Sequence, residues 1–212
     1  STGLRTKFPF DIEREWLALV ELGEIEQSTL KDVFESLLYE AKEKNIVDEV
    51  IVSQNHRQYD EFWKIRELIP EANRLIGSIS NHDISLPIAK IPDFINSACK
   101  EISGISDQLR INCFGHIGDG NIHFNITQPV GYDKEAFLNS WTEVNRVVHD
   151  LVTDMGGSIS AEHGIGILKR EELKLYLPEI HIDIMRQIKT SFDPKNLMNP
   201  DKIFVLDKEK VG

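Results

Sequence analysis

Two histidines flank a short turn of the chain. Apolar runs over residues 109–114 and 122–126 surround residues 118–121, which read Gly-Asp-Gly-Asn. Glycine, Asn and Asp accept the positive φ of tight hairpin connections, so the pattern predicts two antiparallel strands. If these four residues form the loop, His116 lies directly opposite His123, with Cβ atoms about 4.5–5.5 Å apart. Two imidazoles at that separation can share a metal ion; the alternative is a hairpin with two polar residues on a solvated face.

A third candidate ligand lies downstream among small residues. Residues 158–166 read Ser-Ile-Ser-Ala-Glu-His-Gly-Ile-Gly, and a Gly-Gly pair before them is expected to end a helix. Small neighbours allow the backbone to approach a ligand or cofactor closely. Two histidines and one carboxylate, here Glu162, form the ligand set of a catalytic zinc site and equally match other divalent metals. Taken alone, the Glu162-His163 pair could equally be a solvated loop.

Composition narrows the classes of function. The chain has 212 residues, with 41% hydrophobic and 28% charged, which is typical of a globular protein with a substantial core. Its formal net charge is −11, from 24 basic and 35 acidic residues. That balance argues against binding to nucleic acid or to an anionic membrane surface. An anionic substrate would need local cations to capture it.

The cysteines and the apolar runs of the sequence indicate where in the cell the protein is expected. The two cysteines, Cys99 and Cys113, are too few for a disulfide framework and are expected to be reduced core residues. Neither a run of 18 apolar residues nor a secretory signal is present, so we expect no membrane span and a location in the cytoplasm, or in the mitochondrial matrix of a eukaryote. The opening lacks Met and suggests a cut inside a longer chain.

The order of the expected elements predicts an α+β fold. A tight hairpin at the centre requires antiparallel pairing, so we expect an antiparallel sheet with helices on one side, built as two ferredoxin-like units, plus a helical C-terminal extension after Gly166. Apolar periodicity predicts strands over residues 15–22, 47–53, 78–87, 109–114 and 122–126, and helices over residues 29–44, 56–76 (bent or split by Pro70), 92–103, 133–155, 167–176 and 180–192.

Other polar residues allow two interpretations each. Arg66 lies in a helix rich in apolar residues and could pair with a carboxylate or lie at the helix edge with its stem on apolar surface. Residues 81–83, Asn-His-Asp, interrupt an apolar strand and could form a turn or the wall of a site. Lys169 could bind an anion or be solvated. The glycines of residues 115–120 join two strands rather than a strand and a helix, so they do not predict a dinucleotide site.

Three separated motifs resemble one known family. They are residues 115–123, Gly-His-Ile-Gly-Asp-Gly-Asn-Ile-His; residues 160–166, Ser-Ala-Glu-His-Gly-Ile-Gly; and residues 192–203, which include Phe-Asp-Pro-Lys-Asn and Asn-Pro-Asp-Lys-Ile. In this order they resemble the C-terminal half of FAD-linked 2-hydroxy acid dehydrogenases of the vanillyl-alcohol oxidase superfamily. The D-2-hydroxyglutarate and D-lactate dehydrogenase branch is the most similar. The resemblance covers nearly the whole chain.

The resemblance implies different roles for the two parts of the chain. It places FAD in an N-terminal domain that this chain lacks, makes residues 1–155 the substrate (cap) domain, and makes residues 156–212 a segment that packs against the FAD-binding domain. It implies a divalent metal, zinc in the first place and manganese as the second candidate, and His163 as catalytic base. The implied metal ligands are His116, His123 and Glu162; the implied substrate contacts are Arg66, Asn125, Asn81 and Lys169; the implied cofactor contacts are Glu162, Gly164 and Asn199.

The implied reaction is oxidation of a 2-hydroxy acid, of the 2-hydroxyglutarate or lactate type, to the 2-oxo acid. Asn81 stands where the family often has Lys, and Pro70 stands where hydroxyglutarate-type members can have a hydroxyl residue, so the choice of acid stays open. Without the flavin domain the chain is expected to be inactive, and its exposed apolar surface could drive formation of a homodimer. Two alternatives remain: a self-contained metal-dependent hydrolase with a His-His-Glu site, and a non-catalytic ligand-binding module.

Overall fold

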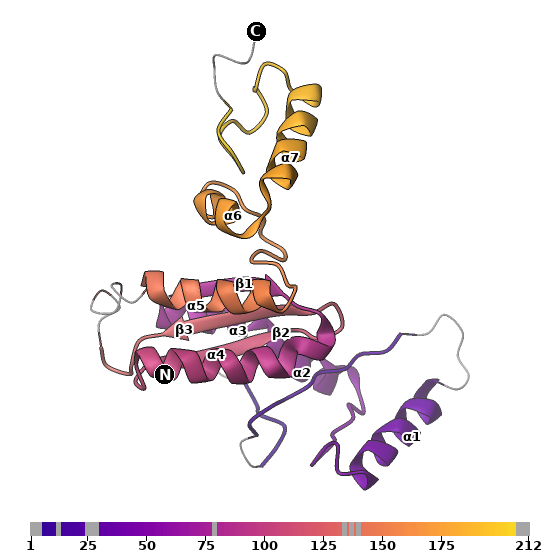
Figure 1. Ribbon diagram of the computed structural model, residues 1–212. Coiled ribbons are helices and arrows are strands. Elements are labelled where there is room, and N and C mark those ends of the chain that lie inside the picture. The colour runs from indigo at the N-terminus through magenta and orange to yellow at the C-terminus, as the bar shows by residue number, and fades with distance from the viewer. Residues whose placement is uncertain are drawn as a thin grey trace. The chain divides into compact units, whose positions relative to one another are not determined.

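The computed structural model describes residues 6–11, 14–23, 30–77, 80–132, 135, 138 and 141–206. The chain forms two compact units, Ser1–Ile76 and Gly77–Gly212, each of which is considered by itself (Figure 1). The predicted starts of three elements, at residue 29, at residues 78–79 and over most of residues 133–140, lie outside the described residues.

The N-terminal unit is helical where it is regular. It contains α1 (Leu30–Glu43), α2 (His56–Glu67) and α3 (Ile69–Ile76). The Asn55 side chain caps α2 by accepting the backbone N–H of Gln58. The helix predicted over residues 56–76 is split as expected, because Pro70 cannot donate a backbone hydrogen bond and is tolerated only in the first turn of α3.

The prediction of two strands in this unit is wrong. Residues 14–23 and 47–54 are irregular, and Trp16 and Val20 are each more than half exposed. An apolar run becomes a strand only when a second backbone pairs with it, because an extended segment has unpaired N–H and C=O groups along both edges. Apolar composition alone therefore did not determine the structure of these two segments.

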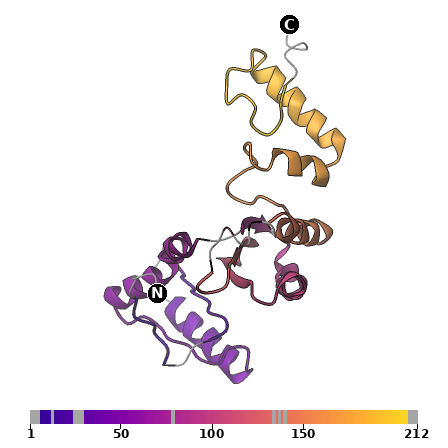
Figure 2. The same cartoon turned by 90° about the vertical axis from the view of Figure 1, so that its left-hand side faces the viewer.

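The C-terminal unit contains a three-stranded antiparallel sheet. Its strands are β1 (Ser80–Ser85), β2 (Arg110–His116) and β3 (Asn121–Thr127), in the order β1-β3-β2. Helices α4 (Ile91–Ile105) and α5 (Trp141–Asp154) lie side by side along one face of the sheet (Figure 1) and are seen nearly end-on after a quarter turn (Figure 2). A short 3-10 helix, Ile88–Lys90, leads into α4. The α+β class and the antiparallel sheet are confirmed.

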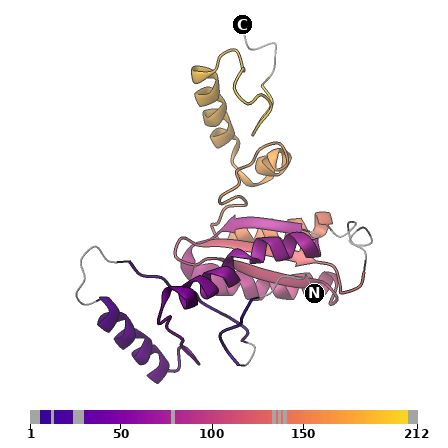
Figure 3. The same cartoon turned by 180° about the vertical axis from the view of Figure 1, so that it is seen from behind.

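The core fills the space between this sheet and its two helices. Phe94 of α4 meets Phe124 of β3 edge to face, with ring centroids 5.4 Å apart. Side chains alternate along a strand, so every second residue of β1 and β3 points into the core. From the opposite side, in Figure 3, the same strands lie in front of α4 and α5. Fully buried residues of this core are Ile84, Phe94, Ile102, Phe124, Ile126, Val144, Val148 and Val152.

Two further helices follow α5 in the C-terminal unit, as predicted for the extension. It contains α6 (Arg170–Tyr176) and α7 (Glu179–Phe192). Beyond α7, the buried carboxylate of Asp193 accepts the backbone N–H groups of Leu197 (2.8 Å) and Met198 (2.9 Å) and pairs with Lys189. The described residues contain one three-stranded sheet, so the expectation of two ferredoxin-like units is supported only as an α+β fold.

The hairpin is present, but its predicted register is wrong by two residues. His116 pairs with Asn121, and Phe114 pairs with His123. Residues 117–120 form the loop, and Asn121 joins β3, where its side-chain amide donates to Asp83 Oδ1 (2.9 Å). A Cβ at position 115 would lie 2.2 Å from the Asn121 carbonyl oxygen, so a glycine is required there. A shift of two residues keeps both histidines on one face as diagonal neighbours.

Candidate functional site

The sheet face opposite α4 and α5 carries polar side chains in adjacent strands. On β3, His123 and Asn125 lie two residues apart and therefore share this face. On β1, Asp83 pairs with His123 and Asn81 pairs with Asn125. Alternation in the strands thus places an apolar row against the helices and a polar row on the other side.

Asp83 is at the centre of the polar row. The residue is 3% exposed, and its Oδ2 accepts the backbone N–H groups of Glu162 (2.9 Å) and His163 (2.8 Å). Its own carbonyl accepts the N–H of Ala161 (3.1 Å). This one residue therefore fixes the 161–163 loop to the edge of the sheet, next to an isolated bridge between Ser85 and Ser158.

These hydrogen bonds determine the charge of Asp83. Burial acts to raise the pKa of the Asp83 carboxyl, but the N–H groups of His163 and Glu162 and the Asn121 amide outweigh it and lower that pKa below its ordinary value. The carboxylate is therefore ionised at neutral pH, and the imidazoles of His123 and His163 lie beside it.

His123 lies between two carboxylates. Its Nδ1 is 4.0 Å from Asp83 Oδ1, and its Nε2 is 3.9 Å from Glu162 Oε2. The ring stacks on Phe114, with centroids 4.9 Å apart, which restricts its rotation. Donor atoms of Asp83, His123 and Glu162 all lie within 4.8 Å of one another.

This donor set fits a divalent metal ion. One imidazole and two carboxylates are ligands that zinc accepts, and manganese also binds carboxylate oxygens. The buried Oδ1 of Asn121, beside Asp83, has no hydrogen-bond partner within the described part of the chain. His116, the third predicted ligand, ends β2 on the same face as His123 and is exposed. Its role as a ligand stays a prediction.

His163, the predicted base, lies at this site. Its side chain is 71% exposed, its Nδ1 is 3.4 Å from Asp83 Oδ2, and its ring centroid is 6.2 Å from that of His123. The imidazole can therefore reach a small molecule bound at the polar face. The structure thus brings together His123, Glu162 and His163, which the sequence predicted from separate segments.

The predicted substrate contacts are distributed over several elements. Asn125 is buried on β3, and Asn81 lies opposite it on β1 and is exposed. Lys169 directs its Nζ to the carbonyl of Ile159 (2.7 Å). Burial lowers the pKa of the Lys169 ammonium, although the charges of Asp83 and Glu172 act in the opposite direction. Arg66 is in α2 of the N-terminal unit.

Two further predicted residues lie in loops with special backbone conformations. Gly164 has φ of 72°, a left-handed conformation that favours glycine. Asn199, which has φ of 45°, lies in the loop after α7, where Asn tolerates such a conformation better than most residues. Contact of these loops with a flavin stays a prediction.

Sequence reasoning missed the role of Asp83. The Asn-His-Asp sequence of residues 81–83 is compatible both with a turn and with the wall of a site. An acidic residue in the middle of a buried strand was the available signal, because a buried carboxylate requires donors. Those donors come from residues 121, 162 and 163, and their proximity depends on the tertiary fold.

A second polar cluster lies on the other face, between the sheet and α5. His82 Nδ1 is 3.3 Å from His149 Nε2, and His149 Nδ1 is 3.1 Å from Glu172 Oε2 in α6. His82 Nε2 also forms a hydrogen bond of 2.8 Å with Ser80 Oγ. Burial, then the nearby charge of Lys169, lowers the pKa of His149 to about 4. Both histidines are almost fully buried, so this cluster is part of the core.

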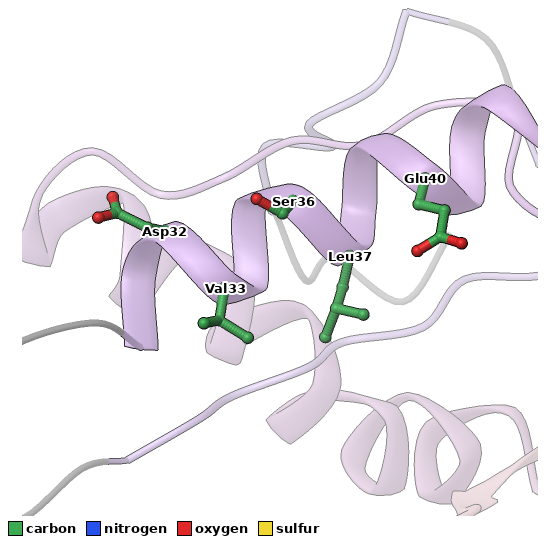
Figure 4. A pocket seen from close by; sticks show the side chains of 5 residues that line it. All are labelled: Asp32, Val33, Ser36, Leu37 and Glu40. Carbon is green, nitrogen blue, oxygen red and sulfur yellow. The ribbon is translucent and has the colours of Figure 1, made fainter.

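Elsewhere, a shallow surface hollow runs along α1. It is lined by Asp32, Val33, Ser36, Leu37 and Glu40 (Figure 4). Its lining contains neither histidine nor a basic group, so it offers neither the ligands nor the cations that the predicted chemistry needs. In the described ranges, no helix has the length and apolar character required to cross a bilayer.

Comparison with known proteins identifies the family of the chain. Residues 4–203 match the family described as FAD linked oxidases, C-terminal domain. The chain belongs to this family. D-2-hydroxyglutarate dehydrogenase of Stutzerimonas stutzeri (strain A1501) is 36% identical over 200 residues, covering 92% of this chain and 42% of that relative. The mitochondrial D-2-hydroxyglutarate dehydrogenase of Arabidopsis thaliana is 31% identical over 201 residues, covering 92% of this chain and 34% of that relative.

Another relative has a different named substrate. A putative mitochondrial D-lactate dehydrogenase of Schizosaccharomyces pombe (strain 972 / ATCC 24843) is 31% identical over 208 residues, covering 93% of this chain and 38% of that relative. The FAD-linked oxidase C-terminal domain thus accounts for nearly all of this chain, which spans between about a third and two fifths of the length of these curated relatives. The resemblance inferred from the three motifs is confirmed at the level of the family.

Proposed function

We propose that this chain is the substrate- and metal-binding portion of an FAD-dependent D-2-hydroxy acid dehydrogenase. The observation that carries the proposal is the convergence of Asp83, His123 and Glu162 beside His163, in a member of the FAD-linked oxidase family. The substrate is a 2-hydroxy acid of the 2-hydroxyglutarate or lactate type, and the product is the 2-oxo acid. The relatives' names support this class of substrate.

The proposed metal ligands are His116, His123 and Glu162. A divalent ion, when bound, would polarise the 2-hydroxyl and neutralise negative charge on the substrate. The side chain of Glu162 is 47% exposed, so it can turn toward an ion without leaving a buried site. Asp83 supplies the nearby negative charge that favours a cation here.

His163 is the proposed base. Its exposed imidazole can approach a substrate hydroxyl, while its backbone N–H remains fixed by Asp83. Histidine is the side chain most often used as a general base, and its imidazole can accept the proton of a hydroxyl group. The C2 hydride requires an acceptor, which FAD provides when bound. We place FAD mainly in the portion of the protein preceding this chain, with Glu162, Gly164 and Asn199 contacting it from this side.

Cationic and amide groups are the proposed anchors of the substrate. Arg66 would hold a carboxylate through its planar guanidinium, and Asn125 and Asn81 offer amide groups on the polar face. Lys169 adds positive charge near Asp83. Because the chain carries a net charge of −11, these few cations determine where an anionic substrate binds. We place the protein in the cytoplasm or, in a eukaryote, in the mitochondrial matrix.

The test is binding of substrate to the isolated chain. Metal-free protein, prepared by chelation, is loaded with zinc or manganese and titrated with D-2-hydroxyglutarate, D-lactate and their L-enantiomers in a calorimeter. We expect at least one D-acid to bind only in the presence of metal, and His123→Ala to abolish the metal dependence. The surface variant His181→Ala is the matched control, since His181 lies exposed on α7.

Two results would contradict the proposal. One is equal binding of the acids with and without metal. The other is reduction of an acceptor dye by the chain alone, because hydride transfer requires the flavin. Metal-dependent esterase or amidase turnover by the isolated chain would favour the hydrolase alternative; the family and the named relatives favour the dehydrogenase.

A further inference from the structure

We propose that Lys169 is a positioning residue: its ammonium closes the loop of residues 159–169 and so holds Glu162 and His163 at the polar face, without itself contacting the substrate. The inference rests on the proposed function, in which Glu162 is a metal ligand and His163 is the base. It replaces the direct substrate contact predicted for Lys169 with a contact inside the chain.

The first argument is the hydrogen bond that Lys169 forms. Its Nζ donates to the carbonyl oxygen of Ile159 at 2.7 Å, across ten positions of the chain. Glu162 and His163 lie between the two bonded residues. Ile159 is 5% exposed and belongs to the hydrophobic core, and Lys169 directly precedes α6. The bond therefore ties the far end of the loop to the core and restricts the conformations of the residues between.

The second argument is the difference between the two sides of the Glu162-His163 pair. Before the pair, the backbone at residues 158 and 161 is bonded to β1. After the pair come two glycines in left-handed conformations, and the second, Gly166, bonds to Ile203 in the C-terminal tail. Glycine loses more conformational freedom on ordering than other residues do. The bond from Lys169 connects this side of the loop to the core.

The third argument is the environment of the ammonium. The charges of Asp83 in β1 and Glu172 in α6 both favour its charged form, so it lies close to acidic groups of the sheet and of α6. Lys169 is only partly exposed, whereas the side chain of His163 is 71% exposed. An ammonium in this place attracts an anionic substrate at a distance, while its hydrogen bond supports the loop.

The first experiment measures the order of the loop and needs neither metal nor substrate. The 15N-labelled chain is freed of metal by chelation, and hydrogen–deuterium exchange is followed at the amides of Glu162 and His163, which donate to Asp83. Lys169→Met keeps an unbranched stem and removes the donor. We expect both amides to exchange about 10- to 100-fold faster, as for loss of one hydrogen bond from a charged donor, while the amides of β3 keep their rates.

Two further variants serve as controls. Lys169→Arg keeps a charged N–H donor on a long stem, so the exchange of both amides should stay slow. Lys202→Met is the matched control, because the Lys202 ammonium also donates to a backbone carbonyl, that of Pro200 at 3.3 Å, but spans only two positions. It should leave the exchange of the loop amides unchanged.

Zinc affinity separates the position of the loop from the charge of Lys169. Removal of a positive charge favours a nearby cation, so loss of the charge alone would raise the affinity for zinc. Displacement of Glu162 lowers that affinity instead. We expect Lys169→Met to bind zinc about tenfold more weakly, the lower end of the range for lost support of a metal ligand. Competition with a chromophoric chelator measures the change.

Three outcomes would overturn the inference. They are rapid exchange of the Glu162 and His163 amides in the unsubstituted chain, unchanged exchange in folded Lys169→Met, and a zinc affinity that is unchanged or raised in Lys169→Met while the affinity for D-2-hydroxyglutarate or D-lactate falls. The last result would make Lys169 a substrate contact. The first needs no variant, so it decides even if Lys169→Met does not fold. If the chain binds neither zinc nor acid, the proposed function fails, and the exchange rates still test the loop.

Discussion

The two faces of the small sheet use the same residue types for opposite purposes. His82 and Asp83 are neighbours in the sequence, yet their side chains point to opposite faces of β1. On the helix-covered face, His82 belongs to a buried cluster with His149 and Glu172. On the polar face, Asp83 belongs to a cluster that includes the exposed side chain of His163.

The two clusters differ in whether their outermost side chains are exposed to solvent. On the covered face, His82 and His149 have partners on both ring nitrogens, and the groups are enclosed by α5 and α6. On the polar face, Asp83 is enclosed, but His163 and Glu162 are largely accessible. Polar residues in a strand thus indicate a ligand site when the outermost members remain accessible.

The largest effect on stability is expected from the apolar side of the sheet. Phe124→Ala removes a fully buried ring that packs against Phe94, and should lower the free energy of unfolding by about 3–5 kcal/mol. Urea unfolding followed by circular dichroism measures this change. A loss below about 1 kcal/mol would show that the core does not depend on this packing.

The covered cluster should make the protein sensitive to acid. The pKa of His149 is about 4 in the folded protein, because of burial first and the charge of Lys169 second, and is near its ordinary value of 6.5 once unfolded. The unfolded state therefore binds the proton more readily. The contribution of His149 to the free energy of unfolding is fully present above about pH 6.5 and is lost as the pH falls toward 4. At about 1.4 kcal/mol for each pKa unit, the loss is about 3 kcal/mol.

Urea unfolding at intervals between pH 7 and pH 4 tests this dependence. The groups around His149 are His82 on β1, Glu172 and Tyr176 on α6, and the charged Lys169. The variant His149→Gln lacks the titrating ring and should lose less stability over this interval. Equal losses in the two proteins would contradict the assignment.

A smaller effect is expected from an apolar replacement in the same cluster. At pH 7, His149→Leu leaves the ring nitrogen of His82 and the carboxylate of Glu172 without this partner, at a cost of about 1–3 kcal/mol. Thermal unfolding followed calorimetrically measures the change. A more stable variant would show that hydrophobic packing at this position outweighs the hydrogen bonds.

The smallest effect on stability is expected on the polar face. The Glu162 side chain is about half exposed, so Glu162→Gln should change the free energy of unfolding by less than about 0.5 kcal/mol. The same substitution removes a ligand charge and should weaken zinc binding, which competition with a chromophoric chelator measures. Unchanged zinc affinity would remove Glu162 from the ligand set.

Local sequence pattern predicted the helices and the hairpin well. Residues 30–43, 91–105 and 179–192 are helical, near the bounds expected from apolar periodicity. The hairpin register was wrong because Asn121 bonds to Asp83, a contact across 38 positions that no local rule contains. The strands expected over residues 15–22 and 47–53 are irregular, since pairing depends on a distant partner.

The site could be predicted only in part, for the same reason. His123, Glu162 and His163 came from motifs, and the structure places them side by side. Asp83 did not, because its significance comes from donors 38 to 80 positions away. Nor did the sequence separate His82 from Asp83, although strand alternation sends them to different faces.

The metal content of the protein is the most direct test of whether the polar face, and not the buried cluster, binds a metal ion. The protein, His123→Ala and His149→Gln are purified without a metal-affinity column, checked for folding by circular dichroism, and analysed for zinc and manganese. We predict about one ion per chain in the unsubstituted protein and in His149→Gln, and none in His123→Ala. Equal metal content in His123→Ala, or loss of metal in folded His149→Gln, would contradict the assignment of the polar face as the metal site.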